Sequence, residues 1–124
     1  MKIGLLFSIL VCCVLCSQYV PIMKTVPGIH FTNPNSQTSI QFVIDPMCAD
    51  SADFDQNIIR PLLDSFDSDT KNKFDFSYIL YPLPFHMTSQ KVSQGIYYIM
   101  DNKGVDSAVQ ALRYIFDNIP DWDE

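Results

Sequence analysis

The sequence has few of the residues that build metal centres and phosphate sites. It contains two histidines and four glycines in 124 residues. No histidine and cysteine spacing matches a zinc site, and residues 64–69 and 121–124 lack the glycine and the terminal glutamate of a calcium loop. There is also no glycine-rich phosphate loop and no G-x-S-x-G motif. We therefore expect neither a metal nor a cofactor.

Basic residues are also scarce. Eight lysines and arginines stand against fourteen aspartates and glutamates, which gives a formal net charge of −6. An acidic surface repels phosphate backbones and anionic lipids. The composition therefore argues against nucleic acid or an anionic membrane as a partner.

No hydrophobic run is long enough to cross a bilayer, which takes roughly 20 residues. Residues 3–16 are almost wholly apolar and follow Lys2, but the run is only about 14 residues long. This pattern predicts a signal peptide over residues 1–17, with cleavage near Cys16 or Ser17, and an uncleaved anchor is the alternative. We expect a protein that is secreted or enters the lumen of the secretory pathway, with no membrane association after cleavage.

Signal cleavage would leave one cysteine, Cys48, because Cys12, Cys13 and Cys16 would be removed. A disulfide framework within the mature chain is then excluded. A single cysteine in an oxidising compartment is buried, pairs between molecules or is used chemically. A disulfide-linked dimer through Cys48 is one of these alternatives.

Residues 18–37 are predicted to be irregular because proline, glycine and asparagine recur there, with a short edge strand near residues 28–31. Residues 38–44 form a nearly continuous apolar or β-branched run, which predicts a strand covered on both faces. Residues 74–80 predict a second strand, after a polar loop over residues 67–73.

Three helices are predicted from apolar residues at helical spacing. In chain order they cover residues 53–66, 88–100 and 106–118, and residues 120–124 are an acidic tail. The first contains Pro61, which should kink it near Ile58. Its apolar residues form a single stripe, made of Phe54, Ile58, Ile59, Leu62, Leu63 and Phe66. Strand, helix and strand in this order predict a β-α-β core with parallel strands, hence an α/β fold with two further helices.

Cys48 follows the first predicted strand directly, after the turn Asp45-Pro46-Met47. The pattern places it at the start of a helix, where backbone amides favour a thiolate. Nearby aspartates, such as Asp45 and Asp50, oppose this effect. Ser51 stands three residues later, where it could cap the helix or donate a hydrogen bond to the thiolate.

Two segments together resemble the DsbA-like (disulfide-bond oxidoreductase) branch of the thioredoxin-like fold. One is residues 42–51, FVIDPMCADS, which is similar to the strand and redox-site segment of that branch. The other is residues 80–86, LYPLPFH, which resembles its P-L-P-[FY]-H segment. The resemblance spans about residues 38–119 and implies an incomplete thioredoxin-like domain. The cis-proline loop and closing hairpin expected after the helices do not follow, so a fragment and a reduced form of the domain are both open.

The resemblance implies redox activity through Cys48, with Ser51 in the position of the second cysteine. Without that cysteine, the expected activity is monothiol thiol–disulfide exchange with protein thiols or disulfides as partners. The alternatives are a non-enzymatic, chaperone-like binding module and a truncated inactive product. The resemblance places His86 in a structural turn rather than as a base, and His30 has no predicted partner.

Overall fold

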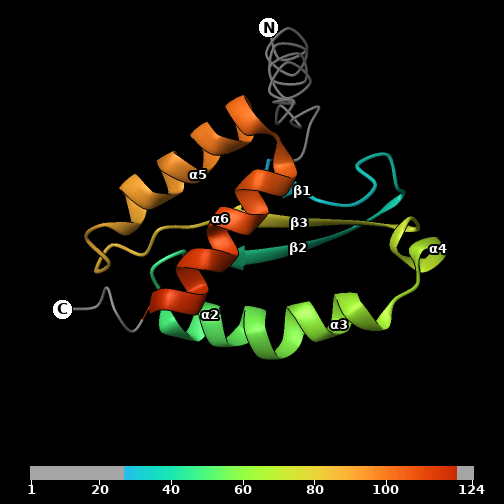
Figure 1. Cartoon of the computed structure of the whole chain (residues 1–124), viewed down its shortest axis with the longest axis horizontal. Helices are drawn as coiled ribbons and strands as arrows, with labels where there is room; N and C mark the ends of the chain where they lie inside the picture. Colours follow the sequence, from blue (N-terminus) through green and yellow to red (C-terminus); the bar gives the residue numbers. More distant parts are fainter. Residues whose placement is uncertain (1–26, 120–124) are drawn as a thin grey trace, which may run out of the picture.

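Two seven-residue strands, β2 (Thr38–Ile44) and β3 (Phe74–Leu80), are the main strands of the sheet in the computed structural model, which describes residues 27–119 (Figure 1). Both predicted strands are confirmed with the predicted boundaries. The predicted signal peptide and acidic tail lie outside the described residues.

The sheet has three strands in the order β1-β3-β2. β2 and β3 are parallel, with Phe42 opposite Tyr78, as the β-α-β pattern predicts. The short strand β1 (Ile29–His30) pairs antiparallel to β3 on its other side. The fold is therefore mixed α/β, and β3 is the central strand.

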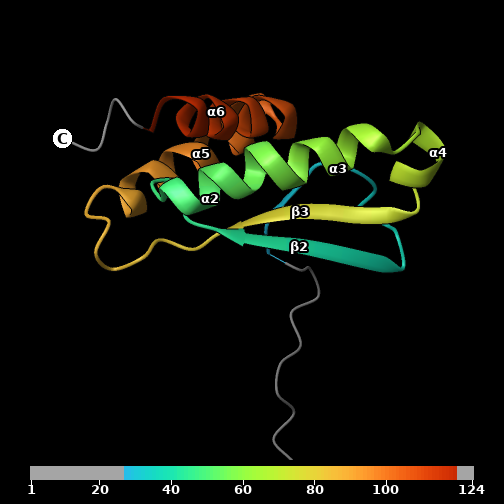
Figure 2. The ribbon, with the colours of Figure 1, turned by 90° about the horizontal axis from the view of Figure 1, so that it is seen from below.

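The described helices cover one face of this sheet (Figure 2). Alternate residues of the strands point to that face, among them the buried Phe76 and Tyr78 of β3. The other residues of β2 point away from the helices and are exposed, and Val43 has 61% of its surface accessible. The prediction that this strand is covered on both faces is wrong for the described part of the chain. Its apolar run includes Ser39 and Gln41, and these two polar residues share the exposed face with Val43.

The helix after Cys48 begins four residues earlier than predicted. It consists of α2 (Ala49–Phe54), a π-helical turn η1 (Asp55–Ile59) and α3 (Arg60–Ser65). The π-helical turn lies where a kink was expected, and Pro61 follows it in the first turn of α3. Proline has no N–H to donate to the preceding turn, and a π-helical turn is one way to accommodate this loss.

The apolar stripe predicted for this helix is divided in two. Ile59 and Leu63 are buried against the sheet, whereas Phe54, Ile58 and Leu62 are exposed. The single-stripe prediction is therefore wrong. A π-helical turn changes the angular spacing of side chains within the helix.

The two C-terminal helices agree with the predicted positions. α5 (Ser89–Lys103) and α6 (Val105–Asn118) are separated by Gly104, whose φ of 88° is a conformation that favours glycine. The segment predicted as a polar loop contains a short helix, α4 (Ser68–Lys71). This helix forms because the side chain of Asp67 accepts a hydrogen bond from the N–H of Thr70 at 2.8 Å.

A buried carboxylate in η1 joins the helical layer to the sheet. Asp55 is fully buried and accepts hydrogen bonds from the Tyr78 hydroxyl and from Nε of Arg60, each at 2.6 Å. Burial raises the pKa of Tyr78, and the neighbouring Asp55 carboxylate raises it further. Arg60 also pairs with Asp117 of α6 at 2.9 Å. This group of residues therefore connects β3, η1, α3 and α6.

Replacing Tyr78 by phenylalanine should destabilise the fold by about 1.5–3 kcal/mol, because the buried Asp55 carboxylate loses a donor. Urea unfolding followed by circular dichroism measures this change. The control is Tyr98→Phe, at an exposed position of α5, which should stay within about 0.5 kcal/mol of the unmodified chain. Equal stability of the two variants would contradict the role given to the Tyr78 hydroxyl.

Candidate functional site

Cys48 lies at the junction between β2 and α2. It is the N-cap residue of α2, with an extended backbone (φ −98°, ψ 124°), and its N–H donates to the carbonyl of Asp45 at 3.2 Å. Its carbonyl accepts the N–H of Ala52 at 3.0 Å, which begins the helix. Cys48 is a free cysteine of intermediate exposure, so its side chain is partly accessible. The junction is where the sequence places this residue.

The turn that carries Cys48 is fixed by the buried side chain of Asp45, which is 3% exposed. The carboxylate accepts hydrogen bonds from the N–H groups of Met47 and Leu83, each at 2.8 Å. It also accepts from Nδ1 of His86 at 2.7 Å and from the hydroxyl of Ser89. These donors come from the turn after β2, from the segment after β3 and from the start of α5. One carboxylate therefore connects three segments around the Cys48 junction.

The carboxyl group of Asp45 responds to two opposing influences. Burial by itself raises its pKa, but the hydrogen bonds from Ser89, Met47, Leu83 and His86 outweigh burial and hold the pKa below the ordinary value of 3.8. Asp45 is therefore ionised at neutral pH. It carries a negative charge beside Cys48 and stabilises the folded state in that form.

Ser51 does not have the capping role considered for it. Cys48 is the N-cap residue, and Ser51 is the third residue of α2. The Ser51 hydroxyl oxygen accepts the backbone N–H of Asp45 at 3.2 Å, so it holds the end of β2 against the helix. A hydrogen bond from Ser51 to the Cys48 thiolate stays a prediction.

A small hollow lies beside this junction. It is lined by Val43, Ile44, Asp45, Ser51, Tyr81 and Leu83. Val43 and Tyr81 are each 61% exposed, so the hollow has an apolar rim that is open to solvent. Phe85 and Met87, which follow Tyr81 in the segment between β3 and α5, are also exposed.

His86 lies in the segment between β3 and α5, where its ring contacts Asp45. This contact matches the structural role that the resemblance implies for it. The sequence did not predict the four-donor arrangement around Asp45. The signal for it was the turn-forming Asp-Pro pair, which predicts that the Asp45 side chain accepts a local hydrogen bond but does not predict its distant donors.

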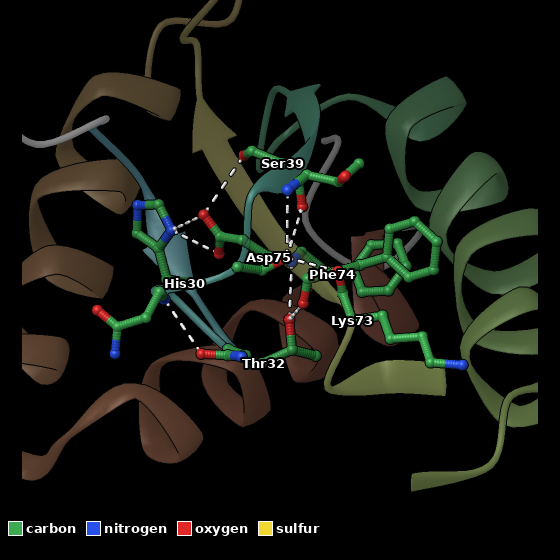
Figure 3. Close-up of polar contacts among 11 residues, drawn as sticks. His30, Thr32, Ser39, Lys73, Phe74 and Asp75 are labelled. Carbon is green, nitrogen blue, oxygen red and sulfur yellow. Dashed lines mark hydrogen bonds and ion pairs between the residues drawn. The ribbon is translucent and has the colours of Figure 1, made fainter. Parts of the chain in front are cut away.

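A second polar cluster lies on the sheet face opposite the helices (Figure 3). Asp75 of β3 is buried and contacts Nδ1 of His30 at 2.8 Å, while the Ser39 hydroxyl donates to it at 3.3 Å. The sequence named no partner for His30, because the pairing depends on the order of the strands. The serine directs its proton to the carboxylate rather than to the histidine. We therefore interpret the cluster as a bridge across three strands and not as a nucleophilic site.

Within residues 27–119, no three histidine, cysteine or acidic side chains gather as metal ligands. In the same part of the chain, no helix combines the length and the apolar character needed to cross a membrane.

Replacing Asp45 by asparagine should destabilise the chain by about 1.5–3 kcal/mol at neutral pH, because charge-assisted hydrogen bonds are lost from a buried site. The pKa of Asp45 is depressed in the folded state, so its contribution is complete above pH 3.8 and is lost as pH falls through the lower folded value. The difference between the two proteins should therefore shrink below pH 3.8.

Urea unfolding at a series of pH values measures this difference. The matched control is Asp101→Asn, an exposed aspartate of α5, which should change stability by less than about 0.5 kcal/mol. A difference between Asp45→Asn and the unmodified chain that grows on acidification would contradict the assignment.

Comparisons with protein-family models, with curated proteins and with solved structures found no match to this chain. The functional proposal therefore depends on the geometry around Cys48 and on the resemblance given by the sequence.

Proposed function

We propose that the chain is a thioredoxin-like protein of the secretory pathway that performs monothiol thiol–disulfide exchange through Cys48. The observation that carries this proposal is the position of Cys48. It is partly accessible and precedes the first turn of α2, and two of its near neighbours in sequence, Asp45 and Ser51, line an open hollow. The parallel pairing of β2 and β3 supports the same assignment, because it is the β-α-β core that the resemblance implies.

The proposed reaction has two steps. In the first, the Cys48 thiolate attacks one sulfur of a substrate disulfide, a new S–S bond forms, and the other substrate sulfur leaves as a thiolate. In the second, the thiolate of an external thiol such as glutathione attacks the substrate sulfur of the mixed disulfide, so that a glutathione–substrate disulfide forms and Cys48 leaves as a thiolate. The external thiol is needed because Cys48 is the only cysteine of the described residues and Ser51 cannot form a disulfide.

Two features near Cys48 would help to position a substrate for the first step. The turn of residues 45–48 is held by Asp45, which keeps the cysteine at the junction. The hollow rimmed by Val43 and Tyr81 would offer apolar contacts to the substrate chain near its disulfide. A rigid nucleophile beside a peptide-binding surface loses little conformational entropy on reaction.

Replacing Cys48 by alanine should reduce the rate of insulin disulfide reduction by glutathione to the rate without protein, since Cys48 is the residue proposed to form the mixed disulfide. The unmodified chain should also acquire the mass of one glutathione at Cys48 when it is incubated with oxidised glutathione, as measured by mass spectrometry of peptides. The control is the triple variant Cys12→Ser, Cys13→Ser and Cys16→Ser, which should keep full activity. Activity that survives in Cys48→Ala would eliminate the proposal.

A non-enzymatic peptide-binding module is the second candidate. It is favoured by the exposed apolar side chains that border the hollow, above all Tyr81 and Val43. Exposed aromatic residues at a concave surface are common anchors for a protein partner. This function needs the same surface but not the sulfur of Cys48.

Tyr81→Asp should weaken the binding of an unfolded, apolar client peptide by about tenfold or more, because the variant places a charge at the rim of the hollow. Fluorescence anisotropy with a labelled peptide measures the affinity. The control is Tyr98→Asp on α5, an exposed tyrosine that does not line this hollow. If Cys48→Ala binds the peptide as well as the unmodified chain and catalyses no exchange, the binding module replaces the enzyme. Equal binding by the two tyrosine variants would contradict a role for the hollow.

A further inference from the structure

One side of β2 is an open edge within the described residues, since this strand pairs with β3 alone. The carbonyl of Ile44 accepts the N–H of Tyr81 at 2.8 Å, so Ile44 directs its backbone polar groups towards β3 and the segment that follows it. These groups alternate in direction along a strand. Ser39, Gln41 and Val43 therefore direct their N–H and C=O groups towards the open edge. The edge is ready to accept another strand.

The open edge has none of the features that commonly prevent edge-to-edge pairing. Such features include charged side chains, proline and β-bulges. The sequence of β2 is TSIQFVI, which has no charge and no proline, and its register with β3 runs without a bulge. An edge of this length and composition favours pairing with another strand.

An exposed apolar row accompanies this edge. It consists of Phe54, Ile58 and Leu62, three residues spaced four apart along α2, η1 and α3, and Ile58 is 53% exposed. The ring of Phe54 contacts the ring of Phe42 in β2, with 6.4 Å between their centroids. The row therefore begins over the edge strand.

The other flank of the same helix faces α6. There, Gln56 donates to the carbonyl of Phe116 at 3.1 Å, and Arg60 pairs with Asp117. The exposed row lies on the flank away from α6. In Figure 1, α2 and α3 run along the β2 side of the sheet. The edge and the row thus form one continuous surface.

We propose that this surface is an interface at which a second copy of the chain adds β2 to β2 in antiparallel orientation. The pairing is centred on Gln41, which lies opposite Gln41 of the second copy. Because Gln41 directs its backbone groups to the edge, this register exchanges both of its hydrogen bonds with the same residue of the other copy. Two three-stranded sheets become one continuous sheet.

A second copy fits this edge because the strand is self-complementary in that register. On the helix-covered face, Ile40 lies opposite Phe42 of the other copy, so an apolar residue meets an apolar residue. No charge meets a like charge, although the chain as a whole is acidic. The two-fold axis is perpendicular to the sheet, so both helical layers lie on the same face. The two exposed rows then meet, with Ile58 near the axis.

This interface is closed and non-covalent. A two-fold arrangement uses the same surface on both copies and stops at two. Cys48 lies beyond one end of β2, so the two Cys48 residues lie at opposite ends of the paired strands. The dimer therefore persists in reductant, unlike the disulfide-linked dimer considered from the sequence. It does not depend on the proposed redox function.

A charge swap at Gln41 tests the proposal. Gln41→Lys and Gln41→Glu each place two like charges opposite each other at the two-fold axis, which should weaken the dimer by about fivefold or more at low ionic strength. An equal mixture of the two variants should recover the dimer, because lysine then lies opposite glutamate. Sedimentation velocity of the full chain in reductant, over a range of concentrations, measures each dissociation constant.

Recovery of the dimer in the mixture is expected only if residue 41 of one copy lies opposite residue 41 of the other. A monomeric unmodified chain at concentrations of about 100 μM would overturn the proposal, as would unchanged dimerisation of either single variant or failure of the mixture to associate. If the chains associated through their N-terminal residues instead, the Gln41 variants would dimerise as well as the unmodified chain.

A second variant tests the apolar row independently of the strand. Ile58→Lys should weaken the dimer because it places a lysine near the axis, whereas Tyr98→Lys, at an exposed apolar position of α5, should leave it unchanged. Circular dichroism of each variant checks that it is folded. Equal dimerisation of Ile58→Lys and Tyr98→Lys would overturn the helix contact and with it the proposed interface.

Discussion

The carboxylate of Asp45 is the constraint on which the candidate site depends. It lies at the end of β2 and collects donors from the following turn, from the segment after β3 and from the start of α5. A buried carboxylate is stable only where several donors surround it, and here they overcome the effect of burial on its pKa. The result is a rigid junction that presents Cys48 at the surface.

A second buried carboxylate determines how the helical layer lies on the sheet. Asp55 lies in the π-helical turn and meets Tyr78 of the central strand, while Arg60 extends the contact to α6. These contacts face the sheet and α6. The remaining flank of the helix, with Ile58 at its centre, is left exposed beside the open edge of β2. The proposed dimer interface is thus a consequence of how this helix is anchored.

The local elements were predictable because their signals are local. Both long strands have the predicted boundaries, and α5 and α6 differ from the predicted helices by a few residues. Periodicity also predicted the parallel β-α-β unit. The errors have identifiable causes. The exposed face of β2 contains Ser39 and Gln41, whose polarity was outweighed by the apolar residues between them. The division of the apolar stripe depends on the π-helical turn, which the spacing of side chains does not reveal.

The sequence by itself determined the strand and helix segments, the acidic balance and the position of Cys48 between a strand and a helix. Each of these follows from residues close together in the chain. The tertiary structure decided which segments meet. It brought Leu83, His86 and Ser89 to Asp45, and it paired His30 with Asp75 across a distance of 45 residues in sequence. It also left one edge of β2 open among the described residues. Such contacts depend on strand order and on which face the helices cover, and neither is encoded in any single segment.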